Sequence, residues 1–512
     1  MHRTVLPALA ALLAAFGALF AILHAGHPVQ EQLAHSDALY LPVLFDDLLR
    51  NGGSLRDWYL TPAPYFFPDF PLYLLAWLAS SAIPAQTTAF ALLQTLLMAC
   101  AVHLLARKVT GPHAWPATAL LAPLLAWLGL HAGDPFLRLY GSAHHYGAFL
   151  CTLLLAALWL GPDDNGRQPA RAWWTGAAGA LLACLTTLSD ALFLVQSVAP
   201  LALALLLCGG TQRLAARLAR MTLLLALPSV LGMWSYRHVV AHPTRYEARL
   251  SLARLPENLA EFGRILAGLF GQQRVLAAVI LLALLAGLVC GAACLRRKPA
   301  PILPRALLGM LVFSTLSCAA TVTVMLLSQQ APPAPRYLIA PLSLPLVAGA
   351  FLLAYWLGAG FRPVGLGLGC VFAGLLAFDA WQVRHADNGG RYFYPEQVAC
   401  IDGALAQSNA RHGVAQYWDA KQLQALSRHR PTMAQYTGDL APMEWITSQR
   451  FFQERYDFAI IAGQEVPFLR LPRAQLVAVN GEPLRSVTCG NREVLLYGPG
   501  RLRMPPPLPA PQ

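Results

Sequence analysis

The sequence predicts a polytopic α-helical membrane protein with about eleven transmembrane helices, followed by a small C-terminal α/β soluble domain. Three observations support this class. The 512 residues are 56% hydrophobic and only 12% charged, and the mean hydropathy of +0.49 is too high for an ordinary soluble protein. Apolar runs of about 18–22 residues recur, and each can cross a hydrocarbon core of about 30 Å. After Trp381 the hydropathy falls and the residue pattern changes.

The basic residues indicate how the chain lies in the membrane. The formal net charge of +12 would suit a nucleic-acid-binding protein, but the sequence has no basic-aromatic patch of the kind such proteins use. Many Lys and Arg residues instead fall in short linkers between apolar runs, as the positive-inside rule predicts for cytoplasmic linkers. We therefore expect a multi-pass protein of a bacterial inner (plasma) membrane, with a cytoplasmic N-terminus and a periplasmic or extracytoplasmic C-terminal domain. The basic linkers carry Arg107, Lys108, Arg167, Arg171, Arg213, Arg217, Arg220, Arg296, Arg297, Lys298, Arg305 and Arg362.

The predicted spans form one membrane module, residues 1–380. The first run is longer than the core of a signal peptide and has no clear cleavage site, so we interpret it as a retained anchor. The segment Phe70–Ile83, of about 14 residues, would reach only about 21 Å, so we expect it to be interfacial or re-entrant. The candidate spans are Val5–Leu23, Gln86–Ala106, Trp115–His131, Tyr146–Leu160, Trp173–Leu188, Ala191–Cys208, Met221–Val240, Val275–Leu295, Leu307–Ser328, Leu338–Leu357 and Val364–Ala380.

Residues 381–500 are predicted to form the α/β domain. Pro395–Ala410 has the pattern of an amphipathic helix, and Tyr456–Ala462 and Glu493–Tyr497 have the pattern of buried strands. The Pro-rich end, residues 501–512, is expected to be a disordered tail.

The placement of cysteine agrees with this sidedness. Eight of the ten cysteines fall within predicted spans, where Cys behaves as a small apolar residue. The other two, Cys400 and Cys489, lie in the soluble domain, and in an oxidising compartment such a pair is expected to form a disulfide. The alternative is a pair of unrelated buried thiols, because sequence alone does not give their separation.

The loop after the first span is the acid-rich part of the membrane module. Between Ala34 and Leu75, aromatic residues and prolines surround five carboxylates. Acids beside a membrane are costly unless they are paired or used. Since this outer side also carries most of the histidines, we expect any chemistry to take place here. The five carboxylates belong to Asp37, Asp46, Asp47, Asp57 and Asp69.

The order of motifs in this loop resembles that of a known superfamily. An acid soon after the first span, a Tyr three residues later, LLRNGGSLRDW and then PYFFPDFPLY are similar to the first loop of the GT-C membrane glycosyltransferases. These include protein O-mannosyltransferases, the aminoarabinose transferases of lipid A and lipopolysaccharide-core transferases. The resemblance covers about residues 1–380. One departure is Asp69-Phe-Pro-Leu, which stands where relatives often have Lys-Pro-Pro-Leu, so no phosphate-binding Lys is implied here.

The resemblance implies an inverting glycosyltransferase. Such an enzyme would move a hexosyl or pentosyl group from a polyprenyl-phosphate donor to an envelope acceptor (glycan, lipid or protein) at the outer face of the membrane. It implies no firm cofactor, although a divalent cation stays open. The alternatives are a lipid-linked saccharide transporter or flippase and a non-catalytic scaffold for envelope assembly. A transporter predicts internal repeats and charges near the midplane, and we find no convincing repeat.

Within this resemblance, Asp37 corresponds to the acid that acts on the acceptor. Glycosyl transfer needs a carboxylate that accepts the proton of the acceptor or orients it, and general base catalysis contributes about 10²–10⁴-fold. The structural alternative is a helix cap, because Ser36-Asp37 precedes an apolar run. Asp46 and Asp47 are further candidates for catalysis or for holding a metal, with a polar helix face as the alternative. The role of Asp69, between two prolines, is left open.

The loop LRLYGSAHHYGAF places His144 and His145 where the chain re-enters the membrane. Neutral imidazole can bind a phosphate oxygen, relay a proton or ligate a metal, and the alternative is interfacial hydrogen bonding. Adjacent side chains on a helix diverge, so at most one of the two is expected to be central. A metal site is weakly supported because no HxxxH or HxH spacing accompanies them. Arg138 in the same loop is a secondary candidate for binding phosphate.

Two further sites complete the set of candidates. Asp190 interrupts a long apolar stretch, and acids within a membrane are functional candidates by default. Arg336-Tyr337 stands at the outer end of a span, where GT-C relatives place a similar pair near the lipid phosphate. A guanidinium can grip phosphate with two parallel hydrogen bonds and keeps its charge; the alternative is a snorkelling Arg with an interfacial Tyr. In the soluble domain, a packing role is favoured over an acceptor groove for His412, Tyr417, Trp418 and Asp419.

Overall fold

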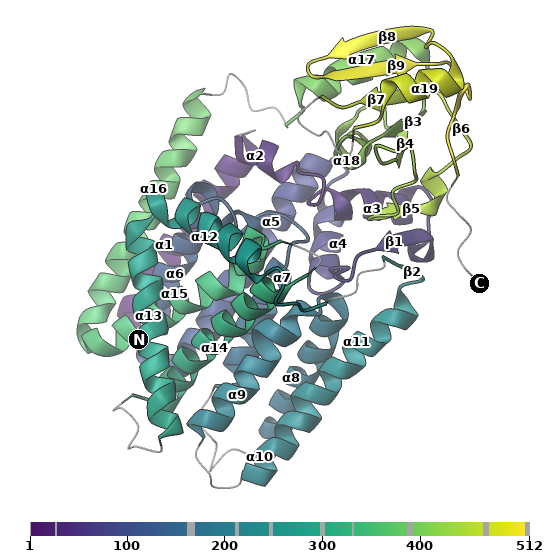
Figure 1. Ribbon diagram of the computed structural model, residues 1–512. Helices are drawn as coiled ribbons and strands as arrows, with labels where there is room; N and C mark the ends of the chain where they lie inside the picture. The colour runs from purple at the N-terminus through teal and green to yellow at the C-terminus, as the bar shows by residue number, and fades with distance from the viewer. Residues whose placement is uncertain are drawn as a thin grey trace.

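The fold is a helical bundle that carries a strand-containing domain at one end (Figure 1). It is known from a computed structural model that describes residues 2–25, 28–160, 169–209, 214–244, 249–296, 303–329, 332–386, 393–463 and 470–506. Arg167, Arg213, Arg297 and Lys298, which the sequence assigns to cytoplasmic linkers, lie outside these ranges.

The first outer loop folds into short elements that lie over the bundle. One of them, α4, has 11 residues and therefore spans about 16 Å, too short to cross a membrane. This length agrees with the expectation that the segment is interfacial or re-entrant. The first helix and the loop elements are α1 (His2–His24), α2 (Pro28–Leu33), α3 (Tyr40–Arg50), β1 (Trp58–Leu60) and α4 (Asp69–Ala79).

The rest of the membrane module is helical. Helix α1 packs against α16 and α6, so the first and last helices of the module lie side by side. Short π-helical turns precede α9 and α11, and β2 (His242–Pro243) follows α11. The helices are α5 (Ile83–Val109), α6 (Ala114–His131), α7 (Tyr146–Trp159), α8 (Pro169–Ser189), α9 (Ala199–Cys208), α10 (Leu214–Met221), α11 (Leu227–Val239), α12 (Leu255–Gln272), α13 (Arg274–Leu295), α14 (Arg305–Leu327), α15 (Ile339–Leu357) and α16 (Phe361–Ala386).

Many of these helices are long and apolar enough to cross a membrane. Among the described residues, seven stretches meet that criterion, and the last of them contains both α15 and α16. Shorter apolar helices of 10–17 residues accompany them, among them α4 and α7. The polytopic helical class is thus confirmed, whereas the total of eleven spans stays a prediction. The seven stretches are Thr4–His24, Ile83–Val109, Gly111–His131, Leu214–Val239, Arg274–Leu295, Arg305–Leu327 and Pro335–His385.

Helix α13 shows how the sequence separates the face towards lipid from the face towards protein. Val275, Leu282 and Val289 recur every seven residues and are 79%, 66% and 69% exposed, as expected for side chains in contact with lipid. On the inner face, a Cβ at Gly287 would lie 2.5 Å from the carbonyl oxygen of Leu311. The glycine therefore allows the close approach of α13 and α14, a device common where membrane helices pack.

The C-terminal domain is an α/β unit around a five-stranded sheet of order β4-β3-β7-β9-β8. Strands β4, β3 and β7 run parallel to one another, and β9 is antiparallel to both of its neighbours, β7 and β8. The predicted helix and both predicted strands are present as α17, β7 and β9. The elements are α17 (Glu396–Ser408), β3 (His412–Ala415), α18 (Tyr417–Leu426), β4 (Thr432–Gln435), β5 (Thr447–Ser448), β6 (Arg455–Tyr456), β7 (Phe458–Ile461), α19 (Arg473–Asn480), β8 (Arg485–Cys489), β9 (Arg492–Leu496) and β10 (Leu502–Arg503).

The limits of this domain differ from the expected ones at both ends. Helix α16 continues to Ala386, past the expected end of the membrane module at residue 380. Leu502 and Arg503 form β10, which pairs with β6 in antiparallel fashion. Leu502 is fully buried, so burial of an apolar side chain keeps ordered structure going past residue 500. Residues 507–512 of the expected tail lie outside the described residues.

The C-terminal domain and the first outer loop share a sheet. Strand β1 of the loop pairs with β2 in parallel and with β5 of the domain in antiparallel fashion. Helix α18 also contacts α3. The domain is therefore attached to the acid-rich loop by backbone hydrogen bonds, which fixes its inner face over that loop.

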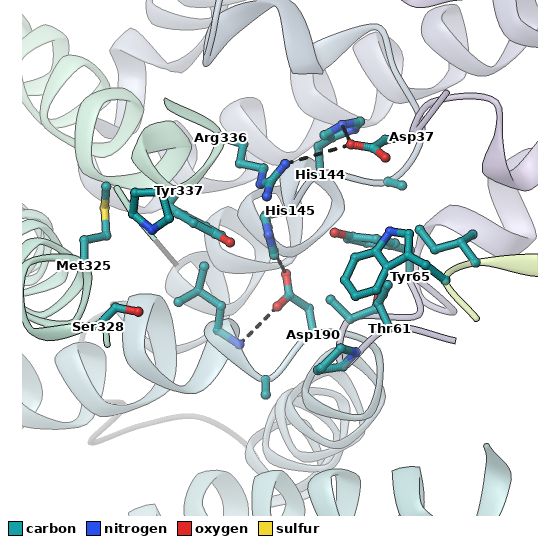
Figure 2. Close-up of a pocket in the computed structure, with 18 of the residues that line it drawn as sticks. Asp37, Thr61, Tyr65, His144, His145, Asp190, Met325, Ser328, Arg336 and Tyr337 are labelled. Carbon is teal, nitrogen blue, oxygen red and sulfur yellow. Dashed lines mark hydrogen bonds and ion pairs between the residues drawn. The ribbon is translucent and has the colours of Figure 1, made fainter. Parts of the chain in front are cut away.

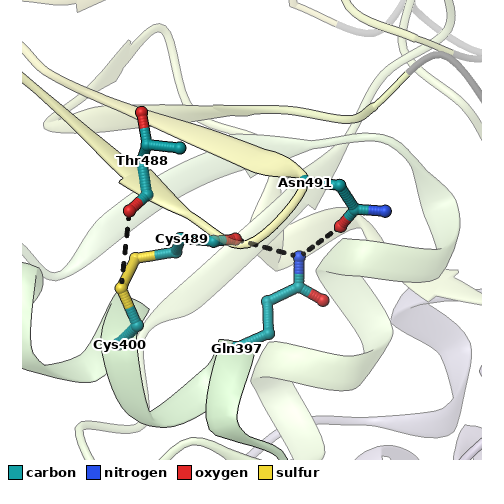
Figure 3. Close-up of a disulfide and its surroundings, with 5 residues drawn as sticks. All are labelled: Gln397, Cys400, Thr488, Cys489 and Asn491. Carbon is teal, nitrogen blue, oxygen red and sulfur yellow. Dashed lines mark hydrogen bonds between the residues drawn. A yellow bond between two sulfur atoms is a disulfide. The ribbon is translucent and has the colours of Figure 1, made fainter.

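The predicted disulfide is present. Cys400 on α17 and Cys489 at the end of β8 are bonded, with their Cα atoms 5.6 Å apart (Figure 3). Nε2 of Gln397, one turn before Cys400, donates a hydrogen bond of 2.9 Å to the side chain of Asn491. The bridge ties α17 to the edge of the five-stranded sheet.

Candidate active site

A cavity of about 790 Å³ lies where the membrane module meets the C-terminal domain. Its walls come from the first outer loop, the loop before α7, the turn after α8, the approach to α15 and the domain itself (Figure 2). One side is apolar and includes Val195, Leu250, Val324 and Met325. The other side holds titratable groups. The cavity therefore combines a surface for a hydrocarbon chain with a polar centre.

Asp37 lies in the polar part of the cavity, in the segment between α2 and α3. Its Oδ1 accepts a hydrogen bond of 2.6 Å from the hydroxyl of Tyr417. Its Oδ2 lies 3.5 Å from Nε2 of His144 and 3.9 Å from Nη1 of Arg336. Burial alone would raise the pKa of Asp37, but its contact with His144 and the hydrogen bond from Tyr417 outweigh it and bring the pKa well below its usual range. The carboxyl is therefore an anion at neutral pH.

The two adjacent histidines do not lie on a helix, contrary to the geometry expected from the sequence. Ala143, His144 and His145 all have positive φ, at 56°, 107° and 70°, and α7 begins only at Tyr146. Non-glycine residues in this region cost of order 1–3 kcal/mol each and persist where the surroundings hold them. This backbone brings both rings to the cavity, so the expectation that at most one would be central does not hold.

Each histidine faces a different acid. His144 lies beside Asp37, and burial lowers its pKa, so its ring is neutral at pH 7. Nδ1 of His145 lies 2.6 Å from Oδ2 of Asp190, and both side chains are buried. Because a carboxylate only accepts hydrogen bonds, Nδ1 of His145 donates and Nε2 is the ring nitrogen left for the cavity. Oδ1 of Asp190 accepts a second bond of 3.0 Å from the backbone N–H of Leu192.

Arg336 supplies a cation to the same cavity. It lies on the short 3₁₀ turn Pro335–Leu338 that leads into α15, after the prolines Pro332 and Pro333. Its side chain is 40% exposed and lies over the ring of Tyr337, at 5.3 Å. The Tyr337 ring also contacts His145, with centroids 5.3 Å apart. A half-exposed guanidinium with a carboxylate no nearer than 3.9 Å can receive an anionic ligand.

Asp46 and Asp47 lie outside the cavity lining. The carboxylate of Asp46 is paired with Arg50 at 2.5 Å, one turn along α3. Asp47 is buried and accepts a 2.8 Å hydrogen bond from the indole N–H of Trp58, with Arg450 of the C-terminal domain 3.5 Å away. Asp46 therefore forms a pair within α3, and Asp47 connects the loop to the domain.

Asp69 and Arg138 are also not among the residues that line the cavity. Asp69 begins α4, and its buried Oδ1 has no hydrogen-bond partner within the described part of the chain. Arg138 is paired with Asp134 at 2.5 Å, and its Nη1 lies 3.0 Å from Nε2 of His144. Arg138 thus contacts a residue of the cavity without lining the cavity itself. Of the predicted site residues, Asp37, His144, His145, Asp190, Arg336 and Tyr337 are brought together.

Three other residues of this cavity were not assigned to the site from the sequence. Tyr65 packs against His145 with ring centroids 5.7 Å apart, and its positive φ of 58° is not visible in the sequence. Tyr417, for which we expected a packing role, reaches Asp37 from the C-terminal domain. His35 precedes Asp37 by two residues, and its Nδ1 lies 3.9 Å from Oδ2 of Asp37. The one sign in the sequence that His35 belongs to the site is its position in the acid-rich first outer loop.

Within the described part of the chain, His35, Asp37 and His144 form a group that could hold a metal ion. One ligand atom from each lies within 4.8 Å of the others. Burial lowers the pKa of both histidines, and neutral imidazoles with one carboxylate are suitable ligands for a divalent cation. When bound, such a cation would add positive charge beside the anion Asp37.

Comparisons with known proteins agree with this architecture. The sequence matches no family model and no curated protein. The structure is similar to ArnT from Cupriavidus metallidurans bound to undecaprenyl phosphate, with a TM-score of 0.53 and 14% sequence identity over 98% of this chain and 99% of that one. For ArnT in the apo state the TM-score is 0.56 and the identity 13%, with the same coverage. The fold is thus that of ArnT over nearly the whole chain, in agreement with the resemblance.

Proposed function

We propose that this protein is an inverting glycosyltransferase that moves a sugar from a polyprenyl-phosphate donor to a hydroxyl of an envelope acceptor. The observation that carries the proposal is the cavity itself, in which the anion Asp37 faces the cation Arg336 beside an apolar wall. Such a site needs a substrate with a long apolar chain, an anionic group and a reacting centre between base and cation. A polyprenyl-phosphate sugar has all three.

The donor would lie with its lipid along the apolar wall and its phosphate at Arg336. The guanidinium can donate two parallel hydrogen bonds to phosphate, and these become stronger as negative charge builds up on the leaving oxygen. His145 is a second candidate in its imidazolium form, because Asp190 holds the Nδ1 proton and Nε2, towards the cavity, donates only when it is protonated as well. The known binding of undecaprenyl phosphate by ArnT, which has the same fold, supports this assignment.

Asp37 would act as the base on the acceptor. As the acceptor oxygen bonds to the anomeric carbon, the bond from that carbon to the phosphate oxygen breaks, and the hydroxyl proton passes to Asp37. The polyprenyl phosphate leaves with the electron pair. A single displacement of this kind inverts the anomeric configuration. General base catalysis of this kind contributes about 10²–10⁴-fold.

The chemistry is proposed to take place at the outer face of the membrane. Arg217 and Arg220 lie on α10, at the end of the bundle opposite the C-terminal domain (Figure 1), as the positive-inside rule predicts for a cytoplasmic linker. The disulfide between Cys400 and Cys489 suits an oxidising compartment. Both observations support a cytoplasmic N-terminus and a periplasmic or extracytoplasmic domain.

The test is donor consumption by the full-length protein in proteoliposomes. Radiolabelled polyprenyl-phosphate sugars, hexoses and pentoses, are supplied with an envelope extract as the source of acceptor. We expect transfer of one sugar to a product with the opposite anomeric configuration, and loss of at least about 100-fold in Arg336→Ala. A product that keeps the donor's configuration would contradict the single displacement. Movement of intact donor across the bilayer without cleavage would favour the flippase alternative.

A further inference from the structure

Both oxygens of the Asp37 carboxylate have a neighbour in this structure. Oδ2 faces Arg336 and the ring of His144, and Oδ1 accepts a short hydrogen bond from Tyr417 at 2.6 Å. A base must accept the proton of its substrate on an oxygen that the substrate can reach. Oδ2 lies on the side of Arg336, where the phosphate is proposed to bind. Oδ1 is therefore the oxygen for the acceptor, and the Tyr417 hydroxyl lies on it.

Tyr417 is held in this position by the structure around it. Tyr417 is the first residue of α18, whose N-cap is Gln416. Only 3% of Tyr417 is exposed. The hydroxyl of Ser36, next to Asp37 in the chain, donates a 2.8 Å hydrogen bond to the carbonyl oxygen of Trp418. Further along the helix, Asp419 is paired with Arg492 at 2.8 Å. The helix is thus fastened both to the catalytic loop and to its own domain.

The phenol of Tyr417 is suited to cover the base without reacting. A phenol is protonated at neutral pH, and its hydroxyl points at a carboxylate oxygen that can only accept, so the group only donates. A hydroxyl of the acceptor can make the same hydrogen bond to Oδ1. Water can too, but Tyr417 is attached to the protein and hidden from solvent, so a lone water competes poorly.

An acceptor brings contacts that water lacks. The wall of the cavity next to Tyr417 is built by the C-terminal domain from Trp418, Met443, Trp445 and Ile446. Large apolar side chains, two of them flat indole rings, bind the apolar face of a ligand and favour its docking. These contacts can offset the loss of the Tyr417 hydrogen bond, whereas a water molecule gains nothing from them.

We propose, on the basis of the proposed glycosyltransferase function, that the acceptor enters along this wall of the C-terminal domain and that its hydroxyl replaces Tyr417 on Oδ1 of Asp37. Tyr417 then determines that the sugar goes to the acceptor and not to water. With the acceptor in place, its oxygen bonds to the anomeric carbon, Asp37 takes the proton and polyprenyl phosphate leaves. With water in its place, the same step would yield free sugar and polyprenyl phosphate.

The test measures two products of the same donor, transferred sugar and free sugar, in proteoliposomes of the full-length protein. Tyr417→Phe removes the hydroxyl and keeps the ring. The matched control is Tyr394→Phe, because the Tyr394 hydroxyl also donates a 2.6 Å hydrogen bond to a carboxylate, that of Asp402, in the same domain but outside the cavity lining. A double variant, Tyr417→Phe with Asp37→Asn, shows whether any free sugar depends on the base.

In Tyr417→Phe, we expect the ratio of free to transferred sugar to rise about 10- to 100-fold, the size of one hydrogen bond to a charged group. The control should keep the wild-type ratio, and the double variant should release no free sugar. An unchanged ratio in a Tyr417→Phe protein that still transfers sugar overturns this inference alone. Loss of transfer without free sugar also overturns it and makes Tyr417 a positioning residue. No donor consumption by wild type overturns the glycosyltransferase proposal instead.

Discussion

The pair formed by His145 and Asp190 offers a quantitative test of the cavity. Asp190→Asn keeps the shape of the side chain but removes the charge that accepts the Nδ1 proton of His145 at 2.6 Å. Both side chains are buried, at 9% and 4% exposure, so solvent does little to weaken the bond. A hydrogen bond to a charged group contributes about 1.5–3 kcal/mol. If His145 acts on the phosphate, kcat/KM for the donor should fall about 10- to 150-fold.

A double-mutant cycle distinguishes a working pair from two independent residues. We expect His145→Gln and Asp190→Asn each to lower kcat/KM, and the double variant to be little worse than the poorer single variant, with a coupling of at least about 1 kcal/mol. The control pair is His131 and Asp379, at 2.8 Å but 39% and 20% exposed and outside the cavity lining; the same substitutions there should leave kcat/KM unchanged. Additive losses at His145 and Asp190 would refute the pair.

Two further predictions concern the C-terminal domain. The disulfide closes a separation of 89 residues, for which chain entropy gives a stabilisation of about 4.6 kcal/mol. Replacing Cys400 and Cys489 with Ser should therefore clearly lower the thermal unfolding midpoint of the full-length protein. An unchanged midpoint would contradict this prediction. Burial lowers the pKa of Lys421 from 10.5 to about 7, so the unfolded state binds more protons between these values and stability rises with pH there. The substitution Lys421→Met keeps the packing over Trp58 and should therefore stabilise the protein more at pH 7 than at pH 9.5. Unfolding midpoints at the two pH values measure this difference. An equal gain in midpoint at both pH values would refute the prediction.

The membrane module was predictable because its signal is local. An apolar run of sufficient length must be a spanning helix when water is absent, since each backbone polar group needs a partner within the segment. The same holds for the buried strands β7 and β9, whose composition differs from that of their neighbours. Arg336 and Asp37 could be assigned to one site because both were expected at the same face of the membrane.

The residues that were missed depend on contacts between distant segments. Tyr417 and Asp37 are separated by 380 positions, and nothing in the local pattern of α18 indicates that its first turn reaches the first loop. Asp46 and Asp47 share an amphipathic helix with a well-placed polar face, so their periodicity alone suited catalysis equally well. Only the position of Trp58 and Arg450 shows that Asp47 connects the loop to the domain.

The loop before α7 shows a different limit. The sequence places the adjacent histidines in a loop just before a span, and the expectation that their side chains diverge uses helical geometry. In the structure three consecutive residues have positive φ, a conformation that sequence predicts mainly for Gly or Asn. Contacts of the two rings with Arg138 and Asp190 stabilise this backbone, and Asp190 lies 45 positions away from His145.

The central claim is that Asp37 is the base, and the most direct measurement is single-turnover transfer from a labelled polyprenyl-phosphate sugar by three proteins in proteoliposomes. They are wild type, Asp37→Asn and, as a control in the same loop, Asp46→Asn. We predict that Asp37→Asn binds donor but transfers it about 10²–10⁴-fold more slowly, while Asp46→Asn stays within a few fold of wild type. The account would be contradicted if Asp37→Asn transferred sugar at the wild-type rate, or if only Asp46→Asn lost transfer.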